Sequence, residues 1–342
     1  MARKARIQRL EFPAGRRVLV VSDIHGSLPL FQGLLDKAGY GPDDILVLLG
    51  DLVEKGQDSL AVLRYVMDLS TRRTVYCVKG NCDDLVTEFV ESPQVRPEFF
   101  HHYLNVWRNR CTLLQMGQEA GFETRSPEDL PALRQVILNH FGPELAFLDT
   151  MPEILLTPDY LFVHGGVWDE DHLEDMTAWD CMKNDSFLDR GICFRRWCIV
   201  GHTPVTLYHP HIPTTHPLVS EKQHIVSIDG GCALQRDAQL NALVLPQVIG
   251  FNAQDPRAAE GYGRLAKACG LAGNPRALAA ALTRLRTRLK IAPRLPVSAG
   301  ELREALPGLT QAALADGCLP ANPRAVQAGD IQALLLEIGG GA

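Results

Sequence analysis

The sequence predicts an α/β fold with two β-sheets. Short apolar, β-branched runs recur near the start of the chain and again in its second half, and segments with helical periodicity separate the first of these runs. Each of the first three runs ends in a polar turn that contains glycine, with the sequences SDIHG, GDLVEKG and KGNCDD. Strands that alternate with helices form parallel sheets, and functional loops gather at the carboxyl ends of those strands. We therefore expect a functional site where these turns meet.

The individual elements follow from the spacing of apolar residues. The first sheet is predicted to contain strands 18–21, 45–49 and 75–78, with helices 28–38 and 59–69 between them. The second sheet is predicted from five later runs, at 160–163, 198–200, 205–208, 224–228 and 240–245. Between the two sets, residues 84–150 have a helical pattern and no strand signal. We interpret this segment as a helical insertion that covers or flanks the site.

The length of 342 residues predicts one large domain with an appendage, because a single core usually stops growing at a smaller size. We place the main domain at 1–250 and a helical C-terminal extension at 251–342. In that extension Leu278, Leu282, Leu285 and Leu289 fall on one face of a helix. These helices are expected to pack on the main domain or on another subunit.

Charge and composition narrow the class of partner. The formal net charge is -6, and the acidic excess lies in residues 1–250, which argues against binding of extended nucleic acid. No run approaches the roughly 18 apolar residues of a membrane span, and the first residues lack the apolar stretch of a signal peptide. The nine cysteines are scattered without a paired spacing, which favours reduced thiols. We expect a cytoplasmic protein without a membrane partner.

Five turns that follow predicted strands carry oxygen and nitrogen ligands. These ligands are Asp23 and His25, Asp51, Asn81, His164 and His202. Carboxylate, amide and imidazole groups in this mixture suit Mn, Fe or Zn. An aspartate shared by two cations holds them about 3.5–4 Å apart, which is the separation that clamps the two oxygens of an in-line displacement at phosphorus. We therefore expect two divalent cations, with Asp51 between them.

The same motifs resemble those of the calcineurin-like metallophosphoesterase superfamily, whose pattern is D-x-H, G-D, G-N-H-[DE], H and G-H. GDLVEKG, FVHGGV, GHTP and SIDGGC are most similar to the bacterial phosphoprotein-phosphatase branch, which includes serine/threonine phosphatases and diadenosine-tetraphosphate hydrolases. The resemblance covers residues 17–246 and implies a four-layer αββα sandwich. It also implies Asp23, His25 and His202 on one metal, and Asn81 and His164 on the other.

Two departures from the family pattern affect the predicted catalytic groups. Cys82 stands where the family has a histidine that protonates the leaving group, and Glu54 and Lys55 replace Asp-Arg. A thiol is a weak hydrogen-bond donor, and as a thiolate it could instead bind metal. We consider Cys82, Asp83 and Glu54 as catalytic candidates, although a solvated loop carboxylate is an equal alternative for both acids. Candidate contacts to substrate phosphate are Lys55, Asn81 and Arg190, the last of which is equally well explained as a surface arginine.

The resemblance implies a metal-dependent phosphoesterase that acts on a phosphoprotein, a nucleotide or a small phosphoester through a metal-bridging water. Family members with GNC at the third motif resemble diesterases, which favours diesters, anhydrides or aryl phosphates with good leaving groups. The alternative is a phosphopeptide- or nucleotide-binding regulator that has lost turnover with the histidine at position 82.

The tail has a separate resemblance. Residues 281–338, which include LTRLRTRLKIAPRL and AVQAGDIQALLLEI, resemble the last helices of iron-containing alcohol dehydrogenases. In that family the metal histidines and the dinucleotide site lie upstream of this segment, and nothing upstream in this chain matches them. We expect a helical module without dehydrogenase chemistry.

Overall fold

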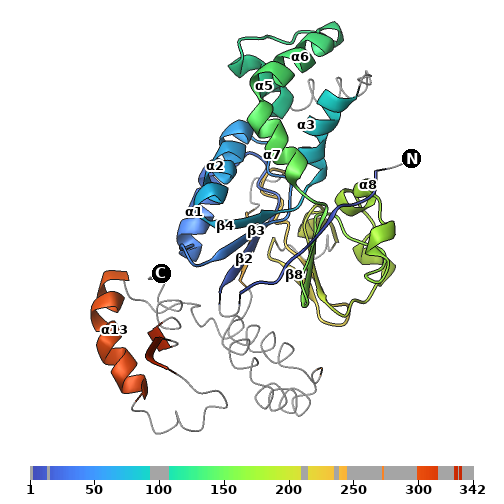
Figure 1. The fold of residues 1–342 in the computed structure, drawn as a ribbon. Coiled ribbons are helices and arrows are strands. Elements are labelled where there is room, and N and C mark those ends of the chain that lie inside the picture. Colours follow the sequence, from blue (N-terminus) through green and yellow to red (C-terminus); the bar gives the residue numbers. More distant parts are fainter. Residues whose placement is uncertain are drawn as a thin grey trace. The chain divides into compact units, whose positions relative to one another are not determined.

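A computed structural model gives the fold of the chain (Figure 1). It describes residues 3–13, 16–92, 108–208, 215–234, 239–244, 272, 299–314, 327–329 and 331–332. The chain divides into two units. Unit 1 consists of Met1–Glu11, Val20–Leu34 and Leu46–Leu243, and unit 2 consists of Phe12–Leu19, Leu35–Ile45 and Val244–Ala342. The predicted boundary near residue 250 stays a prediction.

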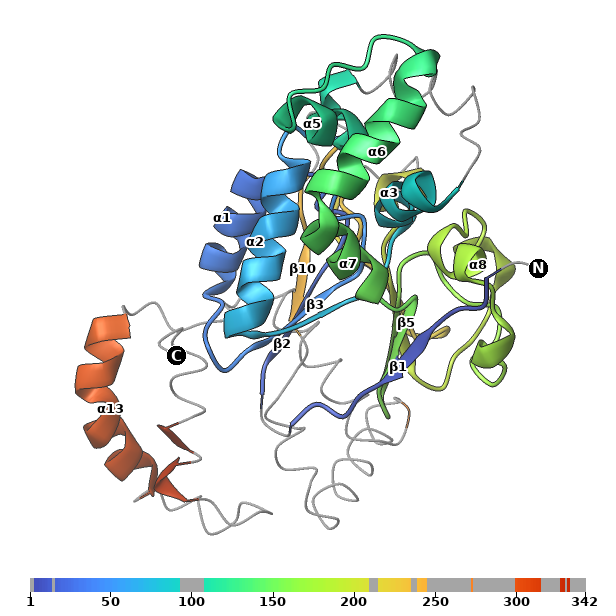
Figure 2. The same cartoon turned by 45° about the horizontal axis from the view of Figure 1, so that its top comes forward.

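The first sheet has four strands in the order β10-β2-β3-β4. Their bounds are β2 Val18–Val21, β3 Ile45–Leu48, β4 Thr74–Cys77 and β10 Ala242–Val244. Every residue of β2 and β3 is buried, as expected for central strands that are covered on both faces. Helix α1 (Leu28–Ala38) connects β2 to β3, and α2 (Ser59–Arg72) connects β3 to β4. Figure 2 shows both helices on one face of this sheet.

The second sheet has six strands in the order β1-β5-β6-β7-β9-β8. Their bounds are β1 Ile7–Arg9, β5 Ile154–Leu156, β6 Tyr160–Val163, β7 Trp197–Val200, β8 Leu218–Ser220 and β9 Ile225–Ser227. The sheet is mixed, because β6 runs parallel to β7 and antiparallel to β5. Its outer face packs on the segment that holds α8 (Ala178–Met182), where Phe187 and Cys181 join the core formed by Val163 and Val200. The predicted four-layer αββα arrangement is confirmed.

The segment between β4 and β5 consists of helices and loops and contains no strand among its described residues. It contains α3 (Asn81–Glu91), α5 (Thr112–Glu119), α6 (Leu130–His140) and α7 (Gly142–Thr150). The short 3-10 helices Arg108–Arg110 and Pro127–Asp129 lie between them. Helix α3 begins at Asn81, three residues before the predicted start of the insertion. Asn81 is thus the first residue of a helix, and a loop was expected there.

Two of the strands predicted for the second sheet are wrong. The run at 240–245 contains β10, which lies in the first sheet beside β2. Residues 205–208 form the short helix α9 (Val205–Tyr208), although Val205 and Thr206 are β-branched. Pro204 precedes the helix, and its carbonyl oxygen accepts a hydrogen bond from Leu207 N. Prolines are common where helices begin, which agrees with the turn of the chain at this point. Strands β1, β5 and β8 were not predicted, because each has only three residues and gives little alternation to detect. Two further 3-10 helices, Leu173–Asp175 and Leu188–Arg190, belong to the outer layer.

Unit 2 is described in part. A buried ion pair joins Arg17 to Asp44, with Arg17 Nε donating to Asp44 Oδ1 at 2.8 Å. The C-terminal residues contribute α13 (Ala299–Leu314), which agrees with the predicted helical extension. The leucine stripe from Leu278 to Leu289 lies outside the described residues. Among the helices that the structure describes, none is long and apolar enough to cross a membrane.

Candidate metal centre

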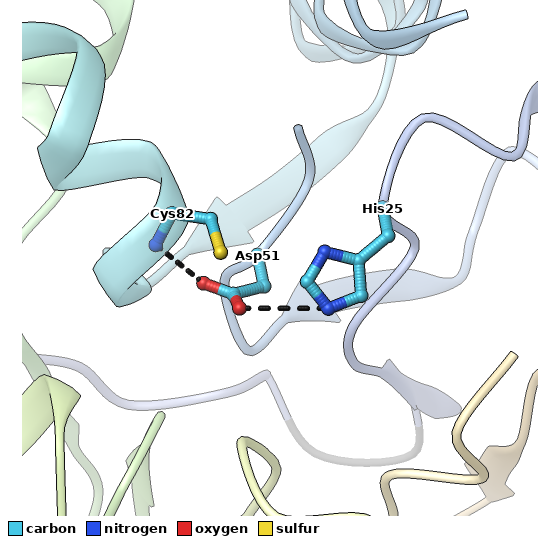
Figure 3. Close-up of side chains that lie close together, drawn as sticks. All are labelled: His25, Asp51 and Cys82. Carbon is cyan, nitrogen blue, oxygen red and sulfur yellow. Dashed lines mark hydrogen bonds and ion pairs between the residues drawn. The ribbon is translucent and has the colours of Figure 1, made fainter. Parts of the chain in front are cut away.

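The predicted ligands follow strand ends in both sheets and lie close together. Asp23, Asp51 and Asn81 follow β2, β3 and β4, while His164 and His202 follow β6 and β7. Asp23, Asp51 and His164 offer ligand atoms that all lie within 4.8 Å of one another. His25, Asp51 and Cys82 form a second such group, shown in Figure 3. Asp51 belongs to both groups, which is the position expected of a shared ligand. The groups place Asp23 with His164 and apart from His25, whereas the sequence predicts Asp23 and His25 on one metal and His164 on the other.

The backbone at these ligands adopts left-handed conformations. The φ angles are 56° at Asp23, 46° at His25, 51° at Asp51 and 68° at His202. Non-glycine residues adopt such angles at a cost of about 1–3 kcal/mol each, and they cluster at functional sites. These loops therefore hold their side chains at the expense of local stability, which favours a functional role over a structural one.

Two glycines permit the close approach of the loops. A Cβ built on Gly80 would lie 2.3 Å from both the amide nitrogen and Oδ1 of Asp51. A Cβ on Gly201 would lie 2.3 Å from Asp23 Oδ2. Because any larger residue would displace a candidate ligand, the glycines of the GN and GH motifs are explained by packing against the two aspartates.

Two histidines are oriented by backbone carbonyls. Nδ1 of His25 lies 3.1 Å from the carbonyl oxygen of Val53, and Nδ1 of His164 lies 2.6 Å from that of Leu49. Nε2 of His25 faces Asp51 Oδ2 at 3.5 Å, and Nε2 of His164 faces Asp51 Oδ1 at 3.3 Å. Histidines that ligate metal commonly donate the other ring N–H to a carbonyl in this way. Both rings therefore present Nε2 to the space around Asp51.

Several buried ligand atoms in this cluster have no hydrogen-bond partner. They are Asp23 Oδ1, Asn81 Oδ1 and His164 Nε2. A buried polar atom left unpaired costs about 1–3 kcal/mol, so Asp23 Oδ1 and Asn81 Oδ1 call for a partner, whereas His164 Nε2 already faces Asp51 Oδ1 at 3.3 Å. The atoms are oxygens and an imidazole nitrogen, which are ligands for a divalent cation. The residues present thus fit the metal ions that the sequence predicts.

The three histidines of the cluster differ in their pKa values. Burial and the Lys55 ammonium lower the pKa of His25 to about 3, and burial and His164 lower that of His202 to about 4. Burial also lowers the pKa of His164, but Asp51 and Asp23 outweigh it and raise the value to about 9. Asp51 has its pKa held well below the usual range because His164, His25 and Lys55 outweigh its burial. His25 and His202 are neutral at pH 7, whereas His164 carries a proton.

Metal affinity is therefore expected to depend on pH. A cation binds neutral imidazole, so below pH 9 it has to displace the proton of His164. The apparent affinity for Mn²⁺ should rise by up to about tenfold per pH unit between about pH 6 and pH 8, and it should level off near pH 9 where His164 loses its proton. Titration calorimetry in buffers of different ionisation enthalpy measures both the affinity and the protons released. Binding that releases no proton at neutral pH would contradict this assignment of charge.

The structure separates His202 and Asn81 from the tightest part of the cluster. His202 donates its backbone N–H to Asp23 Oδ2 at 3.0 Å, and its ring lies 5.2 Å from the His164 ring. Its Nε2 lies 2.8 Å from Asp185 Oδ1. Asn81 orients its amide nitrogen toward Cys82 Sγ at 3.5 Å. Both residues lie beside the cluster, and their predicted place as metal ligands stays a prediction.

Asp83 and Glu54 are buried, so neither is the solvated loop carboxylate considered from the sequence. Asp83 Oδ2 accepts hydrogen bonds from Asp51 N at 2.8 Å and Gly80 N at 3.0 Å, and its Oδ1 accepts one from Leu52 N at 3.0 Å. These bonds hold the loop after β3 against the loop after β4. The structure therefore favours a positioning role for Asp83 over the predicted catalytic one.

Glu54 faces the helical insertion. Its Oε1 accepts a hydrogen bond from Thr112 N at 2.8 Å, at the start of α5. Burial raises the pKa of Glu54 to about 7. Because the side chain is fully buried, contact with a substrate is not supported. Glu54 instead connects the loop after β3 to the insertion.

The predicted phosphate contacts differ in their surroundings. Lys55 Nζ lies 3.1 Å from His25 Nε2 and 3.8 Å from Asp51 Oδ2, at the edge of the cluster. The Arg190 guanidinium is exposed and lies 3.8 Å from the centroid of the Trp168 ring. Among the contacts of the described residues, Arg190 has none to the cluster. Lys55 is in place to meet an anion, whereas the arginine is held on an aromatic ring.

Asp229 was not among the residues predicted from the sequence. This residue follows β9 in the SIDGGC motif, is 3% exposed, and its Oδ1 accepts a hydrogen bond from Gly231 N at 2.7 Å. Burial raises the pKa of Asp229 well above its usual range, and the Asp23 carboxylate and the Lys55 ammonium are among its electrostatic neighbours. An acidic residue before two glycines at a strand end was the available signal.

Comparison with known proteins assigns the family. Residues 16–224 match the model of the calcineurin-like phosphoesterases. This match covers more than half of the chain, so the chain belongs to the calcineurin-like phosphoesterase family. Residues 235–339 match the C-terminal model of the Fe-containing alcohol dehydrogenase family. Both predicted resemblances are confirmed, and the second begins well before the predicted residue 281.

Individual relatives match shorter stretches. The symmetrical bis(5'-nucleosyl)-tetraphosphatase of Glaesserella parasuis is 51% identical over 65 residues, which are 19% of this chain and 23% of the relative. The asymmetrical enzyme PrpE of Halalkalibacterium halodurans is 23% identical over 67% of this chain and 90% of its own length. The 1-propanol dehydrogenase PduQ of Citrobacter freundii is 44% identical over 29% of each chain. The chain thus spans less than a third of PduQ and of the symmetrical tetraphosphatase.

A solved structure of a putative diadenosine tetraphosphatase also aligns with this chain. Its TM-score is 0.46 at 21% sequence identity, and the alignment covers 71% of this chain and 94% of that one.

Proposed function

We propose that this chain is a two-metal hydrolase that cleaves phosphoanhydride bonds in nucleotides of the dinucleoside tetraphosphate type. The observation that carries the proposal is the set of buried, unpartnered ligand atoms around Asp51. Two divalent cations held there would lower the pKa of a water and neutralise the charge that develops on the phosphoryl oxygens. Mn, Fe and Zn all suit the donor set.

The proposed ligands are the residues predicted from the sequence. Asp23, His25, Asn81, His164 and His202 would hold the cations, with Asp51 shared between them. Asp83 fixes the backbone at Asp51 through its hydrogen bonds, and the backbone N–H of Cys82 holds the Asp51 carboxylate at Oδ1, 2.8 Å away. Lys55 presents an ammonium group at the edge of the cluster, where it would meet a phosphate oxygen as a point charge.

The substrate class follows from Cys82. Burial raises the pKa of the Cys82 thiol well above its usual range, and the Asp51 carboxylate adds to this effect. Such a thiol is a poor proton donor to a departing alkoxide. A nucleoside phosphate leaves as a stable anion and needs no proton, so an anhydride suits the site better than an alkyl monoester. Tetraphosphatases among the relatives support the same substrate class.

Substrate comparison tests this proposal. Purified protein loaded with Mn²⁺, Fe²⁺, Co²⁺, Ni²⁺ or Zn²⁺ is expected to hydrolyse diadenosine tetraphosphate with a kcat/KM at least about 100-fold above that for a phosphoserine peptide. The expected ratio reflects the missing general acid, which typically contributes 10² to 10⁴-fold. Cys82→His should raise phosphoserine hydrolysis by about tenfold or more and change anhydride hydrolysis less. No turnover of either substrate with any of these metals would overturn the proposal.

The buried thiol at position 82 also favours a second candidate, a regulator that binds phosphorylated ligands without turning them over. The Cys82→His variant separates the two functions. If the native chain is inactive and this variant gains no activity, the binding function is favoured. A native chain that turns over diadenosine tetraphosphate excludes it.

A further inference from the structure

Cys82 lies inside the metal centre and takes part in its hydrogen bonding. It is the second residue of α3 and is 4% exposed. Its backbone N–H donates to Asp51 Oδ1 at 2.8 Å, which places the side chain beside the shared carboxylate. Figure 3 shows the sulfur pointing toward the carboxylate of Asp51, with the His25 ring on the opposite side of that carboxylate. The thiol is thus directed into the centre and away from solvent.

The distances suit a common ion. One nitrogen of His25, one oxygen of Asp51 and Sγ of Cys82 all lie within 4.8 Å of one another. Ligands that share one cation at about 2.0–2.3 Å have to lie within about 4.6 Å of each other, so only small side-chain movements are needed. The other group of three consists of Asp23, Asp51 and His164. It shares Asp51 with the first group but contains no cysteine. The two positions of the centre therefore differ in donor chemistry.

We propose that Cys82 ligates one of the two cations as a thiolate together with His25 and Asp51, which makes that position selective for Zn²⁺-like ions over Mn²⁺. This inference rests on the two-metal centre proposed above and names the chemistry of one of its positions. On binding, the S–H bond breaks, the proton passes to solvent and the sulfur–metal bond forms, so no atom changes its oxidation state.

A thiolate at this position depends on the cation, because burial and the Asp51 carboxylate hold the Cys82 thiol protonated in its absence. The Lys55 ammonium, which also interacts with Cys82 and Asp51, acts in the opposite direction and favours the thiolate. Thiolate donors favour Zn²⁺ and other softer ions, whereas carboxylate and carbonyl donors suit Mn²⁺. The position formed by Asp23, Asp51 and His164 has no sulfur and should accept either ion. The centre would therefore have one position that prefers Zn²⁺-like ions and one position that accepts either Zn²⁺ or Mn²⁺.

Cobalt substitution tests the sulfur–metal bond. Co²⁺ added to the purified chain is expected to give visible d–d bands and, in addition, a near-ultraviolet sulfur-to-cobalt charge-transfer band. Cys82→Ser should lose the charge-transfer band and keep the d–d bands. Cys82→Asp offers an oxygen ligand at the same place and should behave likewise, which guards against a variant that fails to fold. Cys232→Ser is the matched control, because the Cys232 thiol also lies at the site and donates to the backbone oxygen of Asp23 at 3.1 Å.

The outcomes separate this inference from the proposed function. A charge-transfer band that Cys82→Ser abolishes and Cys232→Ser retains supports it, as does an affinity for Zn²⁺ that Cys82→Ser lowers by about tenfold or more while Mn²⁺ affinity changes less. The d–d bands without a charge-transfer band, or a band that survives in Cys82→Ser, would overturn the thiolate ligand and leave the proposed function intact. Absence of any cobalt binding would overturn both.

Discussion

Replacing Asp51 with asparagine is expected to lower metal-dependent turnover of diadenosine tetraphosphate by well over 100-fold. Asp51 belongs to both groups of candidate ligands, and its carboxylate lies 3.3 Å from His164 and 3.5 Å from His25. Loss of even an outer partner of a metal ligand typically costs 10 to 100-fold, so removal of the shared ligand should cost more. Steady-state kinetics with Mn²⁺, together with the number of metals bound per chain, measures the effect.

The Asp51→Asn variant keeps the size of the side chain, so its fold can be checked independently. Circular dichroism and the urea midpoint should stay close to those of the native chain measured without metal. Asp68→Asn, on the exposed face of α2, is a matched control that should leave both turnover and metal content unchanged. An Asp51→Asn variant with full metal content and native turnover would contradict the role of Asp51 as the shared ligand.

The second large effect is expected from Asp83→Asn, although this residue is not proposed to touch either metal or substrate. The Asp83 carboxylate accepts hydrogen bonds from three backbone N–H groups, those of Asp51, Leu52 and Gly80. An asparagine amide turns a donor toward at least one of them, and a buried unpaired group costs about 1–3 kcal/mol. We expect a loss of about 10 to 100-fold in metal affinity and a lower free energy of unfolding. Calorimetric titration with Mn²⁺ and urea unfolding measure the two quantities.

Asp129→Asn provides the control for this effect. Asp129 Oδ2 accepts hydrogen bonds from the backbone N–H groups of Arg125 at 2.8 Å and Ser126 at 2.9 Å, a similar arrangement in the helical insertion. Its substitution should lower stability slightly and leave metal affinity unchanged. If Asp83→Asn binds metal as tightly as the native chain, the hydrogen bonds of Asp83 between the two loops do not position the metal centre.

The strand ends and the candidate ligands that gather there could be predicted because two signals coincide in the sequence. Buried strands such as β2 and β3 are continuous apolar runs, and the loops after them combine glycine with a carboxylate or histidine. The helix at Val205–Tyr208 was not predictable from composition, since its β-branched residues favour a strand. Its conformation depends on contacts distant in sequence, including the hydrogen bond from Val205 N to the carbonyl oxygen of Asp229.

The roles of the acidic residues were less accessible to sequence reasoning. Glu54 and Asp83 lie beside the ligands in the chain, and this proximity suggested catalysis. The direction in which each side chain points depends on hydrogen-bond partners that only the fold brings close. These partners are Thr112 for Glu54 and the loop after β3 for Asp83. For Asp229 the motif was recognisable in the sequence. Its proximity to Asp23 was not, because the fold brings the end of β9 to the metal centre.

The central claim is that side chains from separate loops hold two cations on either side of Asp51. Anomalous X-ray scattering from crystals of the Zn²⁺-loaded chain tests this claim most directly, because both proposed positions should accept this ion. The account predicts two peaks that share the Asp51 carboxylate, one of them beside Asp23 and His164 and the other beside His25. A single peak, or peaks remote from Asp51, would contradict it.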